Sequence, residues 1–395
     1  GLRDLGFEIL SSGGTARFLR EKGVETKDIS SVTNFPEMLD GRVKSLHPAI
    51  HAGILARRRL KEDMQTLERY GITPIDIVVC NLYPFENTIA KEGVSLEEIV
   101  ENIDIGGPTL VRAAAKNFED VVVVVNPERY GEVLEEIKEK GEVNREKRVV
   151  LAIEAFEHIA RYDAVIANYL RDRLTGEKFP RNLTLSFELI QKTRYGENPH
   201  QEGAVYKAIP VKNGATIINS KKLQGKELSY NNILDADCAI DCLTEFNEPS
   251  AVIVKHATPC GIASAQTVLE AWKDAYETDT YSPFGGVVAF NREVDLELAT
   301  TLSKFFLEVI VAPSFGKDAL EILSKKEKLR LLELPNLSTI KQQSEVMYRS
   351  VGGGLLVQDK DTSLIFGMPK SVIESGCVDE ILPIDRIVDS IIEFI

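Results

Sequence analysis

The sequence predicts an α/β protein of more than one domain, built on largely parallel β-sheets. Short, continuously apolar runs such as 76–82 (DIVVCNL) and 121–125 (VVVVV) alternate with helical stretches. That pattern is typical of parallel strands covered by helices on both faces. The chain has 395 residues, a length typical of two or three domains. Its apolar fraction of 44% and charged fraction of 27% are ordinary for globular domains.

The first half alternates strand and helix. A short strand over 7–10 precedes Ser12-Gly13-Gly14-Thr15, and a helix closed by Gly23 follows. Ser95 and the two glutamates after it resemble a capping box, so we expect a helix to begin there. The other expected elements are a strand over 76–82, a helix over 109–117, a strand over 121–125, a helix opened by Pro127 and a long helix over 151–170.

A polar, turn-rich stretch over 171–182 (RDRLTGEKFPRN) predicts a domain boundary. Beyond it the pattern is again α/β. Apolar runs predict strands over 251–254, 287–290 and 309–312, separated by helical stretches. We find no internal repeat and no low-complexity tract.

Charge and cysteine usage exclude several classes of protein. Lys and Arg total 47 against 61 Asp and Glu, which gives a net charge of −14 and a pI of about 5.1. Such a surface argues against a nucleic-acid binder or an anionic-membrane binder. The cysteines are scattered, with no C-x-x-C pair, which argues against a disulfide framework or a zinc site and favours a reducing, cytosolic compartment; they are Cys80, Cys238, Cys242, Cys260 and Cys377.

No apolar run is long enough for a membrane span, and no signal peptide opens the chain. The chain begins at Gly1 rather than at a methionine. Its opening residues, GLRDLGFEIL, have the pattern of a helix end running into a strand, so we expect the sequence to start within a fold.

Two segments of the first half could bind an anion. Ser12-Gly13-Gly14-Thr15 lies between a strand and a helix, where backbone N–H groups form an anion site; a plain tight turn is the alternative. Arg42 and Lys44 lie two residues apart, so on an extended chain both point to one face. That patch could equally be a solvated edge. His47 and His51 have helical spacing, but Pro48 lies between them and no H-E-x-x-H pattern is present, so we expect no metal site.

Tyr83 and Asp104 are placed for a ligand site. Tyr83 follows the strand over 76–82, and Asp104 lies in a turn before a helix. Ligands of open α/β sheets bind beyond the carboxyl ends of the strands. Asp104 could instead be a helix cap. Lys116 ends the same helix, where the helix dipole alone would favour a cation.

In the second half, Lys255-His256 ends a strand in AVIVKHATPCG. Neighbours on a strand face opposite ways, so for both to serve one site the chain must leave the strand there. We expect the turn at Thr258-Pro259-Cys260-Gly261 to allow this. A Lys-His dipeptide alone is a weak signal. The segment 194–201 (RYGENPHQ) is polar and has no apolar period, which is typical of a functional loop.

Eight of these segments occur in an order that resembles one family. They are SSGGTA, FPEMLDGRVKSLHPAIHAGILAR, NLYPF, IDIGGPTLVRAAAKN, RYGENPHQ, LSYNNILDA, VKHATPCG and SPFGGVVAFN. Together they resemble the bifunctional purine-biosynthesis enzymes that combine AICAR transformylase with IMP cyclohydrolase, over residues 1 to about 362. The resemblance implies a methylglyoxal-synthase-like cyclohydrolase domain over 1–176, followed by a partial cytidine-deaminase-like α/β transformylase domain over 183–362. It leaves an atypical helical tail over 363–395.

The resemblance also implies two chemical steps. The transformylase moves a formyl group from the co-substrate 10-formyltetrahydrofolate to the amine of AICAR, and no metal is required. The cyclohydrolase closes the ring of the product FAICAR, with loss of water, to give IMP. The partners implied are purine nucleotides, folate and a second copy of the chain in a homodimer; nucleic acid and membrane are not among them.

Site residues follow by motif. In the first domain, Ser12, Gly14 and Thr15 would cradle the nucleotide phosphate. The residues that would line the reacting end are Arg42, Lys44, Ser45, Asn81, Tyr83, Asp104, Gly106 and Lys116. Of these, Lys44 and Tyr83 are expected as oxyanion or proton partners, Asp104 as base or orienter and Lys116 as a positive charge.

In the transformylase domain, His256 would handle the proton of the amine. Lys255 would stabilise the carbonyl oxygen or protonate the leaving folate nitrogen. Arg194 and Tyr195 would hold the phosphate and base of AICAR, and Asn232 would contact the substrate.

The sequence departs from the family at both ends. The family's first strand and its Ser/Lys loop are absent from the start, and SDAFFPF-like and QPGGS-like segments are absent after about Thr362. From about Gln358 the tail resembles the C-terminus of chemotaxis protein-glutamate methylesterases, but it has no G-x-S-x-G nucleophile motif. A spliced or chimeric reading frame would explain it, and a natural variant is the alternative. Its apolar residues recur at helical spacing; they are Ile387, Val388, Ile391, Ile392 and Ile395.

Three functions therefore compete: a bifunctional enzyme, an enzyme with only the cyclohydrolase active, and a non-catalytic nucleotide-binding module. The presence of Lys44, Tyr83, Asp104, Lys255 and His256 favours catalysis. The absent C-terminal segments separate the first hypothesis from the second.

Overall fold

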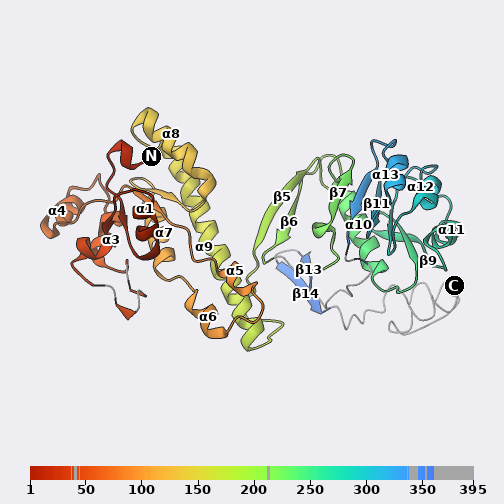
Figure 1. Ribbon diagram of the computed structural model, residues 1–395, viewed down its shortest axis with the longest axis horizontal. Helices are drawn as coiled ribbons and strands as arrows, with labels where there is room; N and C mark the ends of the chain where they lie inside the picture. Colours follow the sequence, from red (N-terminus) through yellow and green to blue (C-terminus); the bar gives the residue numbers. More distant parts are fainter. Residues whose placement is uncertain are drawn as a thin grey trace. The chain divides into compact units, whose positions relative to one another are not determined.

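The structure is a computed structural model, and it describes residues 1–36, 38–39, 42–43, 45–210, 214–335, 337, 346–351 and 354–359. The chain divides into two compact units, Gly1–Ser186 and Phe187–Ile395, which are described separately below (Figure 1). The tail predicted over 363–395 and its apolar residues lie outside the described residues. Within the described part of the chain, no helix is both long and apolar enough to cross a membrane.

Unit 1 is built of helices around short parallel strand pairs. Its strands are β1 (Leu10–Ser11), β2 (Lys27–Asp28), β3 (Ile77–Val79) and β4 (Val122–Val124). Its helices are α1 (Gly13–Glu21), α2 (Ile29–Thr33), α3 (Pro48–Leu55), α4 (Lys61–Tyr70), α5 (Phe85–Ile89), α6 (Leu96–Glu101), α7 (Gly106–Lys116), α8 (Tyr130–Lys140) and α9 (Arg145–Leu174). Strand β1 pairs with β2 and strand β3 with β4, both in parallel. The apolar runs predict β3 and β4, whereas the strand expected over 7–10 lies at Leu10–Ser11 and β2 was not predicted.

The core of unit 1 lies on both faces of β3 and β4. Val123 packs on one face with buried residues of α3, α7 and α9. Val122 and Val124 pack on the other face with Val133 and Ile137 of α8. Successive strand residues point to opposite faces, so a run of five valines serves both layers. The carboxyl ends of β3 and β4 therefore lie together at one edge.

Unit 2 carries a six-stranded mixed sheet. Its helices are α10 (Tyr230–Leu243), α11 (Val268–Thr278), α12 (Leu296–Leu302) and α13 (Lys317–Leu323). Its strands are β5 (Phe187–Thr193), β6 (Gly203–Ala208), β7 (Lys221–Gln224), β8 (Ser250–Lys255), β9 (Thr258–Ser264), β10 (Val287–Phe290), β11 (Val309–Ala312), β12 (Arg330–Glu333), β13 (Val346–Val351) and β14 (Gly354–Asp359). The sheet order is β7-β12-β11-β10-β8-β9, while β5–β6 and β13–β14 form separate antiparallel pairs.

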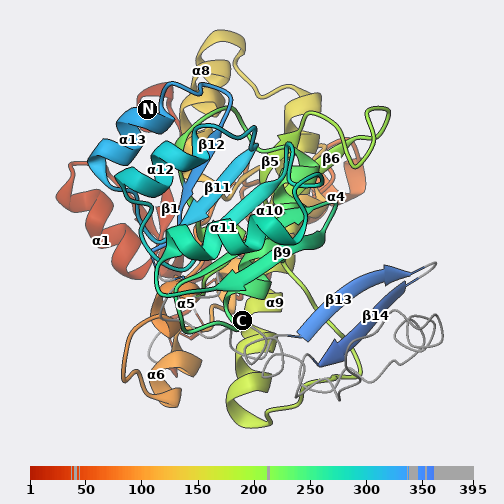
Figure 2. The same ribbon diagram turned by 90° about the vertical axis from the view of Figure 1, so that its right-hand side faces the viewer.

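Helices cover both faces of the six-stranded sheet (Figure 2). Strands β10, β11 and β12 run in parallel at its centre, and β7 and β8 pair antiparallel with β12 and β10 on either side. Strand β9 lies at the edge and pairs antiparallel with β8. Val252 and Val254 of β8 pack with α10 on one face. Ala251 and Ile253 pack with α11, α12 and α13 on the other. Both units thus have the α/β architecture that the sequence predicts.

Candidate functional site

Ser12-Gly13-Gly14-Thr15 lies between β1 and α1 as expected, but only Ser12 is outside both elements, and the other three residues form the first turn of α1. Ser12 is the N-cap residue of α1, and its side chain makes no capping hydrogen bond. Gly13 has a φ of +55°, a conformation that favours glycine. Gly14 and Thr15 are exposed. The exposed first turn of a nine-residue helix therefore carries amides that no side chain of the N-cap residue occupies, an arrangement that can bind a phosphate.

Tyr83 and Asp104 come together beyond β3. One carboxylate oxygen of Asp104 accepts a hydrogen bond from Gly107 N at 2.8 Å, and the other accepts from Tyr83 N at 3.4 Å. The helix-cap alternative is thus correct for the first oxygen, while the second ties Asp104 to the strand end. The Tyr83 side chain remains exposed. This arrangement leaves the phenol exposed at the strand end, where the backbone of Tyr83 is joined to a carboxylate fixed by two hydrogen bonds.

Gly106 and Gly107 let the chain pass close to these groups. A Cβ on Gly106 would lie 2.9 Å from the hydroxyl of the buried Ser45. A Cβ on Gly107 would lie 2.5 Å from an Asp104 oxygen and 2.7 Å from a methyl of Leu82. The structure therefore groups Ser45, Gly106 and Asp104 at the start of α7.

Two tyrosines support this cluster, and the sequence analysis missed both. The hydroxyl of Tyr162, on α9, accepts from Asp104 N at 2.8 Å and lies 3.4 Å from the carbonyl oxygen of Asn102. Burial raises the pKa of Tyr162, so the phenol stays protonated. Tyr130 donates to Asn81 Oδ1 at 2.8 Å, while Asn81 Nδ2 donates to Val125 O at 2.9 Å. Both tyrosines are remote in sequence from their partners, and no local motif marks them.

Cys80 precedes Asn81 at the same strand end. Burial, and secondly the charge of Asp104, raise the pKa of its thiol to about 12. Because the thiolate is the reactive form, this cysteine is inert at neutral pH.

The cationic residues predicted for this site are only partly placed. Lys44 lies outside the described residues. Arg42 is exposed and forms an ion pair with Glu101, which raises the pKa of the guanidinium and lowers that of the carboxyl. Lys116 ends α7, as expected, and lies about 15 Å of helix rise from Gly106. Its side chain lines a shallow apolar hollow with Arg112 and Phe156. Within the described residues, Lys116 is therefore not brought to Asp104.

The two histidines of the first half have local roles. His47 is the N-cap residue of α3 and accepts from Ala49 N at 3.1 Å through Nδ1. The ring of His51 lies against His47 O at 3.3 Å. Across the described part of the chain, no group of three or more His, Cys, Asp or Glu side chains could hold a metal ion.

In unit 2, Lys255 and His256 lie at the tip of the β8–β9 hairpin, but the predicted turn is wrong. The turn consists of His256 and Ala257, with φ of +56° and +52°. Thr258-Pro259-Cys260-Gly261 belongs to β9, with Thr258 paired to Lys255. Two residues of positive φ make the tight hairpin connection whose twist matches the flanking strands. His256 is exposed, and Lys255 Nζ donates to Phe284 O at 2.7 Å.

The polar segment 194–201 is a loop between β5 and β6, as expected. Arg194 is exposed and Tyr195 half-buried. The loop contacts the start of α10, where Asn231 Nδ2 donates to Glu197 O at 3.3 Å. Asn232 is buried: it forms a capping box with Ser229, and its Nδ2 donates to Glu308 Oε2 at 2.7 Å. Asn232 thus fixes the helix start beside the loop.

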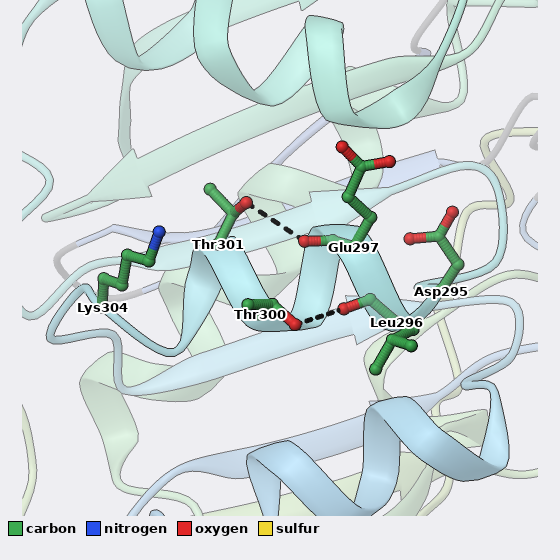
Figure 3. A pocket seen from close by; sticks show the side chains of 6 residues that line it. All are labelled: Asp295, Leu296, Glu297, Thr300, Thr301 and Lys304. Carbon is green, nitrogen blue, oxygen red and sulfur yellow. Dashed lines mark hydrogen bonds between the residues drawn. The ribbon is translucent and has the colours of Figure 1, made fainter.

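A second hollow lies on α12 and is unrelated to the predicted residues. It is lined by Asp295, Leu296, Glu297, Thr300, Thr301 and Lys304. Figure 3 shows these side chains along one helix. Thr300 and Thr301 donate to the carbonyl oxygens one turn earlier, at 2.7 Å and 3.1 Å, so their hydroxyls are used by the helix itself.

Comparison with known families covers residues of both units, and the second match begins inside unit 1. Residues 1–109 match the MGS-like domain, and residues 114–375 match the AICARFT/IMPCHase bienzyme. The chain belongs to the AICARFT/IMPCHase bienzyme family. The match continues past Thr362, where the sequence resemblance was expected to end.

Curated relatives are similar over most of the chain. The bifunctional purine biosynthesis protein PurH of Caldicellulosiruptor saccharolyticus is 51% identical over 92% of this chain and 71% of its own length. PurH of Bacillus subtilis is 52% identical over 91% of this chain and 70% of its own length. The crystal structure of ForH is 36% identical over 42% of this chain and 85% of that one, with a TM-score of 0.38.

Proposed function

We propose that this chain carries out the last two steps of IMP synthesis, one in each unit. Formyl transfer from 10-formyltetrahydrofolate to AICAR takes place in unit 2, and dehydrative ring closure of FAICAR takes place in unit 1. Family membership supports the pair of activities. The observation that carries the assignment is that each compact unit holds its own cluster of reactive groups, Tyr83–Asp104 in one and Lys255–His256 in the other.

For ring closure, the phosphate would bind the amides of Ser12, Gly14 and Thr15 at the start of α1. The carboxamide nitrogen attacks the formyl carbon, and the carbonyl oxygen gains charge before water leaves. Tyr83, exposed at the strand end, is a donor for that oxygen, with Lys44 as its cationic partner. Both oxygens of Asp104 already accept backbone hydrogen bonds, which favours an orienting role over that of a base. Arg42, Ser45, Asn81 and Gly106 complete the proposed set. Lys116, about 15 Å along α7 from Gly106, would contribute only as a more distant positive charge.

For formyl transfer, the amine of AICAR attacks the formyl carbon of the folate. His256, exposed at the hairpin tip, is the proposed acceptor of the amine proton. An ammonium group has three donors, and Lys255 uses one on Phe284 O. The others remain for the developing oxyanion or the leaving nitrogen. Arg194 and Tyr195 would hold AICAR. Asn232 caps α10 and would support the binding site by fixing the start of the helix beside the loop.

The domain limits and the setting of the enzyme belong to the same proposal. The cyclohydrolase domain spans 1–176, and the N-terminal part of the transformylase domain spans 183–362 and extends further, because the family match runs on to residue 375. The enzyme acts in the cytoplasm as a homodimer on small molecules. The scattered cysteines and the family resemblance support this setting.

A paired assay on the purified chain tests the proposal. Ring closure of supplied FAICAR and formyl transfer to AICAR are measured for the wild type and for Lys255→Ala and Tyr83→Phe. Lys255→Ala should abolish formyl transfer and spare ring closure, and Tyr83→Phe should do the reverse. Loss of both activities in Lys255→Ala would break the two-site assignment, and absence of formyl transfer in the wild type would leave only the cyclohydrolase.

A further inference from the structure

The turn that carries His256 has an uncommon backbone. His256 and Ala257 both have positive φ, although neither is a glycine. Residues with a Cβ occupy this region rarely, and two in succession need support from the surrounding structure. The strands on either side favour a two-residue turn of positive φ, because its twist matches theirs, but neither His256 nor Ala257 is a residue that adopts this conformation freely. Contacts from outside the hairpin can offset the cost of this conformation.

Helix α10 supplies that support. Asp235 is buried on α10, and its Oδ1 accepts from Ala257 N at 2.7 Å. One turn later, Cys238 Sγ lies 3.6 Å from Ala257 O and donates to it. Helix α10 therefore hydrogen-bonds both the backbone N–H and the backbone carbonyl of Ala257, the residue that follows His256. Within the described residues, this is the one hydrogen bond found for the Asp235 carboxylate.

We propose that Asp235 is a positioning residue for formyl transfer. Its hydrogen bond to Ala257 N holds the tip in the left-handed conformation, and that conformation sets the direction of His256 relative to Lys255. Because neighbours on a strand point to opposite faces, Lys255 and His256 can serve one substrate only if the chain turns between them. This inference rests on the proposed function of the Lys255–His256 pair.

The substitutions that test this proposal distinguish the effect of losing the Asp235 carboxylate from the effect of changing the conformation of the turn. Asp235→Ala removes the acceptor. Asp235→Asn keeps an oxygen that can accept from the amide. Ala257→Gly makes the left-handed conformation accessible without outside support, because glycine occupies it freely. Asp237→Ala, at an exposed position of the same helix, is the matched control.

We expect Asp235→Ala to lower kcat of formyl transfer on the order of 10²-fold, the cost of misplacing a reacting group by about 1 Å. KM for AICAR should change by less than about twofold, because the lost contact does not touch substrate. Asp235→Asn and Asp237→Ala should stay near wild type. The double variant Asp235→Ala/Ala257→Gly should regain on the order of tenfold in kcat, and ring closure should be unchanged throughout.

His256→Ala keeps the two ideas distinguishable. If His256→Ala transfers formyl at the wild-type rate, the proposed function of the pair fails. If His256→Ala is inactive while Asp235→Ala is normal, only the positioning role fails. An equal loss of kcat in Asp235→Ala and in the double variant would also overturn it. Should Asp235→Ala fail to fold, the same decision comes from Asp235→Asn: a loss there on the order of 10²-fold, not reduced by Ala257→Gly, contradicts the proposal.

Discussion

Gly107→Ala should damage ring closure by displacing Asp104. The new Cβ would lie 2.5 Å from an Asp104 oxygen, and ordinary contact begins at 3.4 Å, so the oxygen must retreat by about 0.9 Å. The Leu82 methyl, 2.7 Å from the same Cβ, further restricts how the alanine can be accommodated. Both hydrogen bonds of the carboxylate, to Gly107 N and to Tyr83 N, would change together.

Overpacking of this kind costs about 1–3 kcal/mol in the free energy of unfolding. A shift of about 1 Å in an orienting group lowers kcat on the order of 10²-fold. We therefore expect IMP formation from FAICAR to fall by that factor, with formyl transfer in unit 2 unaffected. The assay measures both rates, with urea unfolding of the same samples.

A glycine elsewhere in unit 1 provides the control. A Cβ on Gly131, in α8, would meet nothing within 4 Å. Gly131→Ala should therefore leave ring closure unchanged and stabilise the helix by up to about 1 kcal/mol. Wild-type kcat and an unchanged unfolding midpoint in Gly107→Ala would refute the reasoning about Asp104.

Three further predictions concern unit 1. Tyr162→Phe leaves Asp104 N without its acceptor, so the free energy of unfolding should fall by about 1–3 kcal/mol in a urea titration. Ring closure, followed as IMP formation, should also become slower. Asn117→Ala removes the donor from two buried carbonyl oxygens at the end of α3, so the free energy of unfolding should fall by about 2–4 kcal/mol in the same titration. Unchanged stability would contradict this prediction. Hydrogen bonds, first from Lys147, lower the pKa of the buried Glu136 carboxyl from 4.5 to about 2. A depressed pKa stabilises the fold above pH 4.5, and this contribution should be lost as the pH falls toward 2; Glu136→Gln should flatten that part of the stability profile, and an unchanged profile would contradict the assignment.

The sequence predicted best what local patterns determine. Strands 287–290 and 309–312 have the predicted limits, because each apolar run is buried on both faces. The turn after Lys255 was wrong, because His256-Ala257 lacks the glycine or asparagine that marks such turns. The carboxylate that holds it comes from Asp235, 22 residues earlier. Such support is invisible to any local pattern.

The same limit applies to the candidate sites. Tyr83 and Asp104 could be assigned to one site because Tyr83 ends a recognisable strand and Asp104 lies in a recognisable turn before a helix. Arg42 was expected in a cationic patch, whereas Glu101, 59 residues away, pairs with it. Tyr130 and Tyr162 were missed because each hydroxyl meets its partner only through tertiary packing. Charge and polarity mark candidates in a sequence, and the fold decides which of them meet.

The order of strands in unit 2 has a consequence for synthesis on the ribosome. Strand β7 lies at the sheet edge beside β12, more than 100 residues later, and Gln224 of β7 donates to three carbonyl oxygens of the segment before β12. The β8–β9 hairpin can pair as soon as it emerges, but β7 must wait until β12 has been made. During that interval the nascent chain presents an unpaired strand, so a translational pause before Arg330 would prolong the period in which β7 can pair with the wrong neighbour.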